Sequence, residues 1–480
     1  MARKIALALL ILAAGAPGVF AADLRMVLEL RDPAAIGRLE RTYRFHVLDA
    51  VAGQPVFLIE GEETLLERLQ RRPEVLGVEV DQPVRVASDG ATNLDQSLIW
   101  LFSEQPATTF YGAEVIEEYS GQDALALVGA ADVWDKADGS GTRIAFIDTG
   151  VDPDHPALRP WIRGGVDLLG TGSTSETGGM DQSLIWLFQR FTTLLRSPDL
   201  DQSLIWLFIE DLRRMDLDQS LIWLFGQQLR ALGLDQSLIW LFGGDINTLN
   251  STDSGHLDQS LIWLFDENTA GSFFGHGTVV AGLLHLVAPE ADLVPIRAFD
   301  AGGNSSLFLT TAGVYAAVAQ GADVINMSFS IGTGSMAFRR ALNFATSRGV
   351  ALVASAGNSA MDASNVFPAA YPAVAAVGAT DFEDRIAEFS NFGKVIDLVA
   401  PGKNVVSTYP GGLYATASGT SFSAPMVSGA IAVLMSGGYQ GNAAVPALEN
   451  AADEVDSVNP DYVRQLGRGR INLKGAFESR

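Results

Sequence analysis

An apolar run at residues 144–147, ending in Asp148, Thr149 and Gly150, places the tightest limit on the fold. Four apolar residues followed at once by a polar turn with glycine predict a short buried strand. The carboxyl ends of buried strands are where α/β sheets place their active sites, so Asp148 is a candidate functional residue. An aspartate there can also simply cap the next turn, and this run alone does not separate the two roles.

A second motif, centred on His276, supplies a candidate base. The 480-residue chain has no cysteine and five histidines, so a serine nucleophile would need a histidine to activate it. His276 lies between two glycines that leave its ring accessible, and an apolar helix is predicted to begin right after it. The other histidines have less suitable settings: His46 in the N-terminal segment, His155 in a proline-flanked turn, His256 in a polar loop and His285 in an apolar helix.

A third motif places Ser421 after Gly419 and Thr420 and just before an apolar helix predicted over 430–435. A serine at a helix start can use its own N–H to stabilise a developing oxyanion. Taken alone, such a turn is more often a helix cap than a nucleophile.

Together, the motifs at 148–150, 276–278 and 419–425 resemble the subtilisin family, whose catalytic residues are known to follow the same chain order. The resemblance covers about 122–480 without an internal insertion. It implies an α/β fold: a subtilisin-like catalytic domain with a mostly parallel sheet flanked by helices. It also implies a serine endopeptidase that hydrolyses peptide bonds in polypeptide substrates through an acyl-enzyme.

The resemblance carries roles for four residues. Ser421 would attack the scissile carbonyl, His276 would take and return its proton, and Asp148 would orient His276. Asn358, at the end of the strand-like segment 353–358, would supply the second oxyanion donor through its amide.

The resemblance also implies a substrate cleft. One wall would be Ser328, Phe329 and Ser330, where the family usually has glycine at the position of Ser330. The opposite wall of the pocket for the side chain before the scissile bond would be Ala354, Ser355, Ala356 and Gly357. Val366 would form its floor, and a β-branched floor predicts a preference for small or medium apolar side chains.

The sequence indicates no metal ligand set and no cofactor required for this chemistry. Many relatives bind a structural calcium in an Asn-rich loop after the helix that carries the histidine, and residues 281–289 contain no such loop. Asp292 or Asp300 could still bind calcium, but such residues are more often just solvated. The net charge of -24 and the lack of a basic patch argue against a nucleic-acid partner.

The N-terminal part resembles a leader followed by a small domain. Residues 1–21 have a basic start, an apolar run and small residues before Ala21, which predicts a signal peptide and a secreted or extracytoplasmic (periplasmic or extracellular) protein. Strand and helix patterns alternate over 22–87 and predict a small α+β domain. Its place before a protease suggests a propeptide that inhibits the enzyme intramolecularly, as in a zymogen. Residues 88–121 are predicted to be a linker.

One octapeptide, Asp-Gln-Ser-Leu-Ile-Trp-Leu-Phe, recurs without change. Its copies begin at Asp95, Asp181, Asp201, Asp218, Asp235 and Asp258. All but the first lie in or next to an insertion at about 170–257 that interrupts the peptidase domain. Five consecutive apolar residues must bury against something, so the copies could pack on one another or bind a membrane surface or partner. An adhesion or membrane-associating protein acting through these repeats is therefore an alternative function.

Overall fold

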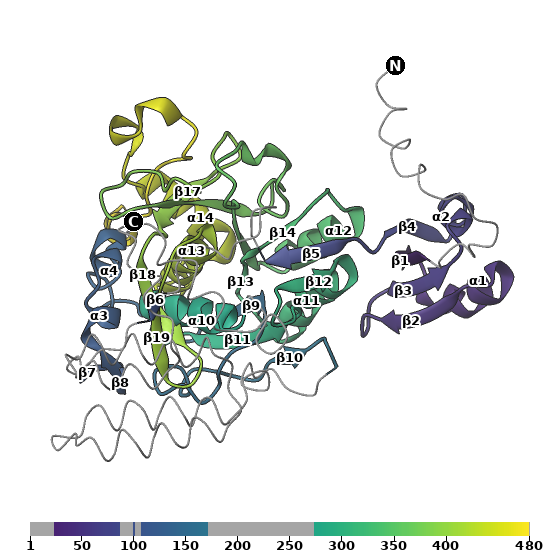
Figure 1. The fold of residues 1–480 in the computed structure, drawn as a ribbon, viewed down its shortest axis with the longest axis horizontal. Helices are drawn as coiled ribbons and strands as arrows, with labels where there is room; N and C mark the ends of the chain where they lie inside the picture. The colour runs from purple at the N-terminus through teal and green to yellow at the C-terminus, as the bar shows by residue number, and fades with distance from the viewer. Residues whose placement is uncertain (1–23, 87–98, 101–106, 171–272, 480) are drawn as a thin grey trace, which may run out of the picture. The chain divides into compact units, whose positions relative to one another are not determined.

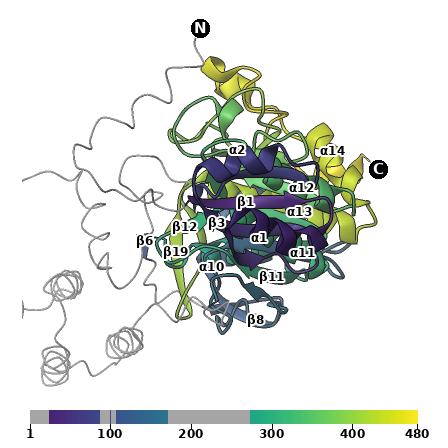
Figure 2. The same ribbon diagram turned by 90° about the vertical axis from the view of Figure 1, so that its right-hand side faces the viewer.

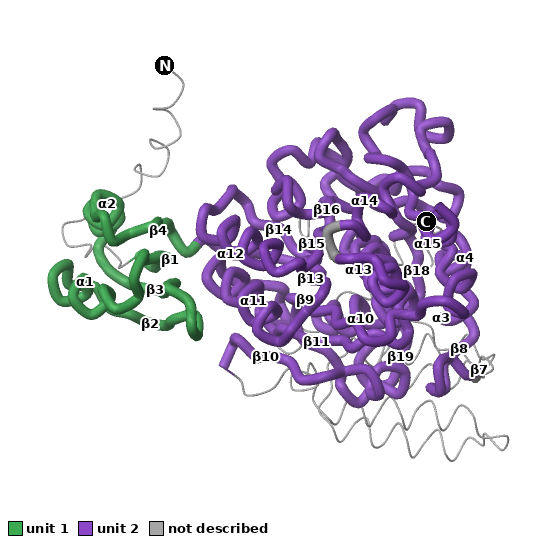
Figure 3. Tube along the Cα trace, turned by 180° about the vertical axis from the view of Figure 1, so that it is seen from behind, with its two compact units in different colours: residues 1–81 green, residues 82–480 purple. Residues whose placement is uncertain are grey.

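The computed structural model describes residues 24–86, 99–100, 107–170 and 273–479. The chain divides into two compact units, residues 1–81 and residues 82–480, which Figure 3 draws in different colours. The predicted signal peptide and insertion, and every repeat residue except Ile99 and Trp100, lie outside the described residues.

The small unit is an α+β module with a four-stranded antiparallel sheet in the order β2-β3-β1-β4. Its core is lined by β1 and by leucines from both helices, including Leu39, Leu65 and Leu69. The elements are β1 (Leu24–Leu30), η1 (Pro33–Ala35), α1 (Ile36–Tyr43), β2 (His46–Ala50), β3 (Val56–Gly61), α2 (Thr64–Gln70) and β4 (Val75–Val80).

The large unit contains a seven-stranded sheet in the order β10-β11-β9-β13-β15-β16-β17. All its strand pairs are parallel. This confirms the α/β class and the mostly parallel sheet predicted from the sequence. The strands are β9 (Arg143–Asp148), β10 (Val166–Asp167), β11 (Asp292–Arg297), β13 (Val324–Met327), β15 (Ala351–Ser355), β16 (Ala375–Thr380) and β17 (Leu398–Pro401).

Helices flank this sheet, with α10 packed against α13 and α11 against α12 (Figure 1, Figure 2). Helices α10 and α13 are apolar around most of their circumference because each is buried between the sheet and other helices. The helices of the unit are α3 (Glu117–Ser120), α4 (Asp123–Val128), α10 (His276–Val287), α11 (Leu307–Ala319), α12 (Met336–Thr346), α13 (Thr420–Ser436), α14 (Gly441–Ala451) and α15 (Leu473–Glu478), with short 3₁₀ turns η6 (Ala363–Asn365), η7 (Asp456–Val458) and η8 (Pro460–Tyr462).

The order of the sheet reverses at β9. Strands β11 and β10 lie on one side of β9, while β13, β15, β16 and β17 follow on the other. Loops leaving the carboxyl ends of neighbouring strands diverge at such a switch point and leave room for a ligand. Asp148 is the last residue of β9 and therefore lies at this switch point.

Smaller sheets complete the unit. Strand β5 (Pro83–Val86) lies between β12 (Asn304–Ser306) and β14 (Phe329–Ile331) and is antiparallel to both (Figure 1). The others are formed by β18 (Val405–Tyr409), β19 (Leu413–Ala417) and β6 (Ile99–Trp100), and by β7 (Ala107–Phe110) and β8 (Ala113–Ile116).

Two predicted boundaries differ from the structure. Residues 83–86 pair within the large unit rather than with the small domain predicted over 22–87. Residues 107–121, predicted as part of a linker, form β7, β8 and α3. Phe110 and Tyr119 from this segment are buried in the main core, and the Tyr119 hydroxyl donates to the carbonyl oxygen of Gly282 at 2.7 Å.

Candidate active site

Asp148 and His276 are hydrogen-bonded although 128 residues separate them in the sequence. Nδ1 of His276 lies 2.8 Å from Oδ1 of Asp148, and the two side chains are 4% and 1% exposed. The same carboxylate oxygen accepts from the N–H of Thr149 at 2.8 Å. This carboxylate is therefore held in place from its own turn while it contacts the imidazole.

Glycines on both sides of His276 let its backbone approach other segments closely. Gly275 precedes α10 with φ 86, and a Cβ there would lie 2.4 Å from the Tyr409 ring. A Cβ on Gly277 would lie 2.0 Å from the carbonyl oxygen of Gly150. The glycines noted in the sequence thus serve close packing, and His276 itself is buried rather than accessible.

Ser421 lies in the first turn of α13 and is fully buried. Its Oγ has no hydrogen-bond partner within the part of the chain that the structure describes. The next residue, Phe422, packs its ring against that of His276, with centroids 5.4 Å apart. The serine turn and the histidine turn therefore meet at one place. Helix α13 begins after Gly419 (φ 155, ψ 153).

Asn358 is joined to the residue before Ser421. Its Oδ1 accepts from the Thr420 N–H at 2.9 Å and from the Thr420 hydroxyl at 2.7 Å. The Thr420 hydroxyl in turn accepts from the N–H of Gly357 at 3.1 Å. With its oxygen held in this way, the amide of Asn358 turns its donor end, Nδ2, away from Thr420.

A buried polar chain supports the Ser421 turn from the sheet. The Ser328 hydroxyl donates to the carbonyl oxygen of Ser421 at 2.9 Å and accepts from the Asn326 amide at 2.9 Å. Oδ1 of Asn326 accepts from the hydroxyl of Ser428, in α13, at 3.0 Å. Sequence reasoning did not assign Asn326 or Ser428 to the site. Asn326 could have been recognised from the sequence, because it is a single asparagine within the apolar strand at 324–327.

The predicted substrate-binding residues lie on adjacent segments. Ser328 immediately precedes β14, and Phe329 and Ser330 are the first two residues of that strand. Strand β13 pairs with β15 so that Met327 is opposite Ala354. Ala354 and Ser355 end β15, and Ala356 and Gly357 follow. A Cβ built on Gly357 would lie 3.5 Å from Cγ1 of Val366, so these two predicted pocket residues are neighbours.

The remaining histidines lie apart from this arrangement. His46 is exposed in β2 of the small unit, and His256 lies outside the described residues. His155 and His285 are buried with aromatic rings, and burial lowers the pKa of both, to about 3 for His285. The ring of His285 packs on Trp161 and Phe110 with centroid distances of 4.2 and 5.3 Å. Both are therefore neutral core residues near pH 7.

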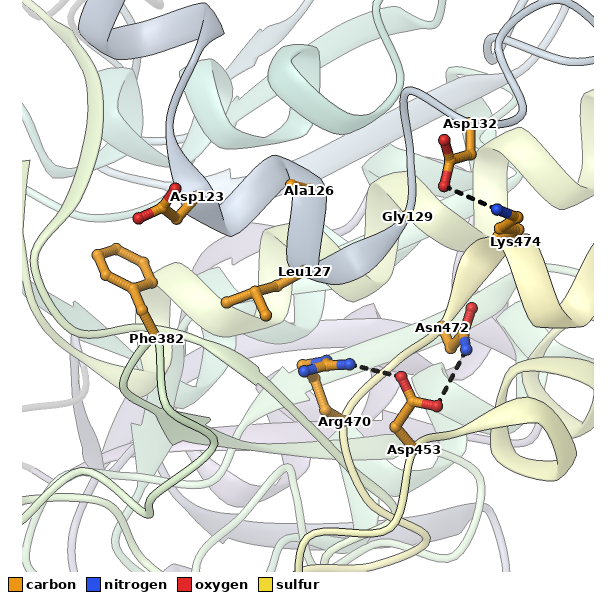
Figure 4. Close-up of a pocket in the computed structure, with 10 residues that line it drawn as sticks. All are labelled: Asp123, Ala126, Leu127, Gly129, Asp132, Phe382, Asp453, Arg470, Asn472 and Lys474. Carbon is orange, nitrogen blue, oxygen red and sulfur yellow. Dashed lines mark hydrogen bonds and ion pairs between the residues drawn. The ribbon is translucent and has the colours of Figure 1, made fainter.

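A separate surface pocket of about 450 Å³ lies between α4 and the C-terminal segment (Figure 4). Most of its charged groups have partners within the pocket: Asp132 pairs with Lys474 at 3.5 Å, and Asp453 contacts both Arg470 and Asn472. None of the predicted site residues lines this pocket. The described ranges contain no cluster of three or more metal-ligating side chains and no helix long and apolar enough to cross a membrane.

Comparison with known proteins identifies related sequences and solved structures with a related fold. Residues 139–466 match the model of the subtilase family. The chain is 27% identical over 361 residues to thermitase from Thermoactinomyces vulgaris, covering 73% of this chain and 94% of that protein. It is 37% identical over 213 residues to subtilisin Savinase from Lederbergia lenta, covering 42% of this chain and 77% of that protein.

Among solved structures, the chain is similar to fervidolysin from Fervidobacterium pennivorans, described as a keratinolytic enzyme related to subtilisin. The TM-score is 0.60 at 20% identity, and the match covers 97% of this chain and 62% of fervidolysin. The chain thus spans less than two thirds of that protein, and the likeness at this identity concerns the fold.

Proposed function

The chain belongs to the subtilase family and is a subtilisin-like serine protease, and we propose that Asp148, His276 and Ser421 form its catalytic triad. The observation that carries this proposal is the 2.8 Å hydrogen bond between buried Asp148 and His276, next to the turn that holds Ser421. A serine nucleophile requires a base that is both close and oriented, and the Asp148 contact supports the orientation of His276.

The Asp148 contact determines which ring nitrogen acts as the base. An ionised carboxylate can only accept hydrogen bonds, so Nδ1 of His276 carries the proton that Asp148 accepts. Nε2 then has the lone pair that takes the proton of Ser421 as Oγ attacks the scissile carbonyl. The imidazolium returns this proton to the leaving amine, and water repeats the sequence in reverse to hydrolyse the acyl-enzyme.

Two donors would stabilise the negative charge that develops on the carbonyl oxygen. The N–H of Ser421 lies in the first turn of α13, where backbone N–H groups have no partner within their own helix. Thr420 holds the amide oxygen of Asn358, and Nδ2 of the same amide would donate to the oxyanion. In subtilisin, loss of the corresponding side-chain donor is known to lower kcat by about 10²–10³, and we expect a comparable effect of Asn358→Ala.

The triad is tested with a fluorophosphonate label and a peptide-hydrolysis assay on the purified chain. The reagent should modify the wild-type protein and spare Ser421→Ala, which should also lose hydrolysis. Ser423→Ala is a matched control, because Ser423 is equally buried in the same helix and should leave labelling intact. Labelling that persists in Ser421→Ala would reject the assignment of the nucleophile.

We propose further that residues 82–86 occupy the substrate cleft of their own chain. Strand β5 pairs with β14, with Arg85 opposite Ser330 and Val86 opposite Phe329, and with β12 on its other side. Val84 and Val86 are each 1% exposed, while Arg85 points to solvent. A peptide substrate would bind as such a central strand, so the segment that follows the small unit acts as an inhibitor until it is cleaved.

The register supports a specific maturation bond. A substrate paired as β5 is would place the residue after the Val86 position opposite Ser328, whose hydroxyl bonds to the carbonyl oxygen of Ser421. In this chain that residue is Ala87, so we propose self-cleavage between Ala87 and Ser88. Mass spectrometry of the wild type should find a fragment ending at Ala87, and Ser421→Ala should remain intact. A different end in the wild type would reject this register.

Release of the segment from a secreted enzyme fits the leader predicted over 1–21, and we propose an extracytoplasmic location on that pattern. We also propose that Val366 limits the pocket before the scissile bond to small or medium apolar side chains, to which alanine belongs. The repeats stay without an assigned role: the alternative of adhesion or membrane association has no support from the residues that the structure describes.

A further inference from the structure

The side chain of Gln82 is held at both ends by Thr333, which lies two residues after β14. Its Nε2 donates to the carbonyl oxygen of Thr333 at 3.2 Å, and the Thr333 hydroxyl donates to its Oε1 at 2.8 Å. The backbone of Gln82 is held as well, because its carbonyl oxygen accepts from the N–H of Leu307 at 2.9 Å. Both polar ends of the amide therefore have a partner that matches them.

Thr333 is exposed and lies close to the fixed start of a helix. It lies in the short segment between β14 and α12, two residues before Ser335, which caps α12 by accepting from the N–H of Phe338 at 3.0 Å. The hydroxyl of Tyr371 accepts from the N–H of Ser335 at 2.7 Å and donates to its carbonyl oxygen at 2.9 Å. The segment that follows Thr333 is therefore fixed, and beside it Thr333 offers one donor and one acceptor to Gln82.

The register of β5 determines which position of a substrate would contact Thr333. If the scissile bond follows Ala87, then Gln82 is the sixth residue on its amino side. We infer that Thr333 forms a carboxamide-binding subsite, which selects glutamine at the sixth position before the scissile bond of polypeptide substrates. This inference rests on the proposed peptidase function and on the proposed maturation bond.

The chemistry of the subsite separates glutamine from its closest alternatives. Methionine matches the shape of glutamine, but its thioether sulfur is only a weak acceptor and it has no proton to donate. Glutamate can accept from the Thr333 hydroxyl, but its carboxylate has no proton to donate to the Thr333 carbonyl oxygen. We therefore expect glutamine to be preferred over both, and by about 3- to 10-fold in kcat/KM for two solvent-accessible hydrogen bonds.

The test uses enzyme matured from the full chain and three reporter peptides, Gln-, Met- and Glu-Pro-Val-Arg-Val-Ala, with the pentapeptide Pro-Val-Arg-Val-Ala as a fourth. Thr333→Val should lower the preference for glutamine over methionine to below about 3-fold and leave the pentapeptide rate unchanged. Glutamine should still exceed glutamate in this variant, because the backbone carbonyl remains. Thr333→Ser keeps the hydroxyl and should behave as the wild type does.

Equal kcat/KM for the three hexapeptides in the wild type, with the pentapeptide cleaved, would overturn the subsite and leave the peptidase function standing. A pentapeptide rate that falls in Thr333→Val as much as the hexapeptide rates would also overturn it, since Thr333 would then support only the cleft. Failure of the wild type to cleave any of the four peptides would overturn the peptidase function, and this inference with it.

Discussion

Thr420→Val tests whether the orientation of Asn358 controls the chemical step. The substitution keeps the size of a buried side chain but removes the hydroxyl that bonds to Asn358 and to the N–H of Gly357. The Thr420 N–H still donates to Asn358, so the amide oxygen keeps one of its two bonds from Thr420. One such bond is worth about 0.5–1.5 kcal/mol net, which converts to a fall in kcat of about 2- to 12-fold.

The same substitution should lower stability, because it leaves the N–H of Gly357 buried without a partner at a cost of about 1–3 kcal/mol. We expect kcat to fall and KM to change little, since an oxyanion donor acts mainly in the transition state. Kinetics with a reporter peptide measure the first effect. Urea unfolding of the variant in a Ser421→Ala background, which prevents self-digestion, measures the second.

Two comparisons decide whether the reasoning is right. Thr420→Ser retains the hydroxyl and should keep kcat within about 2-fold of the wild type. In an Asn358→Ala background, Thr420→Val should have little further effect on kcat, because the amide that it orients is already gone. If Thr420→Val lowered kcat by the same factor with and without Asn358, the proposed coupling between the two residues would be refuted.

Three other changes have distinct expected outcomes. Burial lowers the pKa of His285 to about 3, below the unfolded value near 6.5. Between these pH values, unfolding therefore takes up a proton. The free energy of unfolding should fall as the pH drops, by up to about 1.4 kcal/mol per pH unit. Urea unfolding of an inactive serine variant from pH 6.5 to 4 should show this fall, and His285→Phe should reduce it; an unchanged slope would contradict the argument. Gly277→Ala should abolish hydrolysis, because its Cβ would lie 2.0 Å from the carbonyl oxygen of Gly150. Gly332→Ala has open space around its Cβ, so its rate of hydrolysis should stay within about 2-fold of wild type. Equal rates for the two variants would count against the close packing of Gly277 on Gly150. Val366→Ala should raise kcat/KM for phenylalanine relative to alanine before the scissile bond by about 10-fold or more, and a peptide-library profile unchanged from wild type would show that Val366 does not limit the pocket.

Much of the architecture follows from local patterns. The apolar run at 144–147 becomes β9 because a strand buried on both faces needs continuous apolar residues. Strand β2 (His46–Ala50) has no clear signal in the sequence, because its residues are mostly exposed and show no clear alternation. The sequence predicts a linker at 107–121 because the burial of this segment depends on a partner, Gly282, that lies 163 residues away from Tyr119.

The site divides in the same way. The sequence alone determined the types and order of the residues that can do the chemistry, because aspartate, histidine and serine stand out next to glycine and short apolar segments. Only the tertiary structure decided that Nδ1 of His276 is the nitrogen facing Asp148, that Thr420 orients Asn358, and that residues 83–86 lie between β12 and β14. Local patterns reflect the chemistry of neighbouring residues, whereas these contacts join segments at least 62 residues apart, which only the packing of the whole unit brings together.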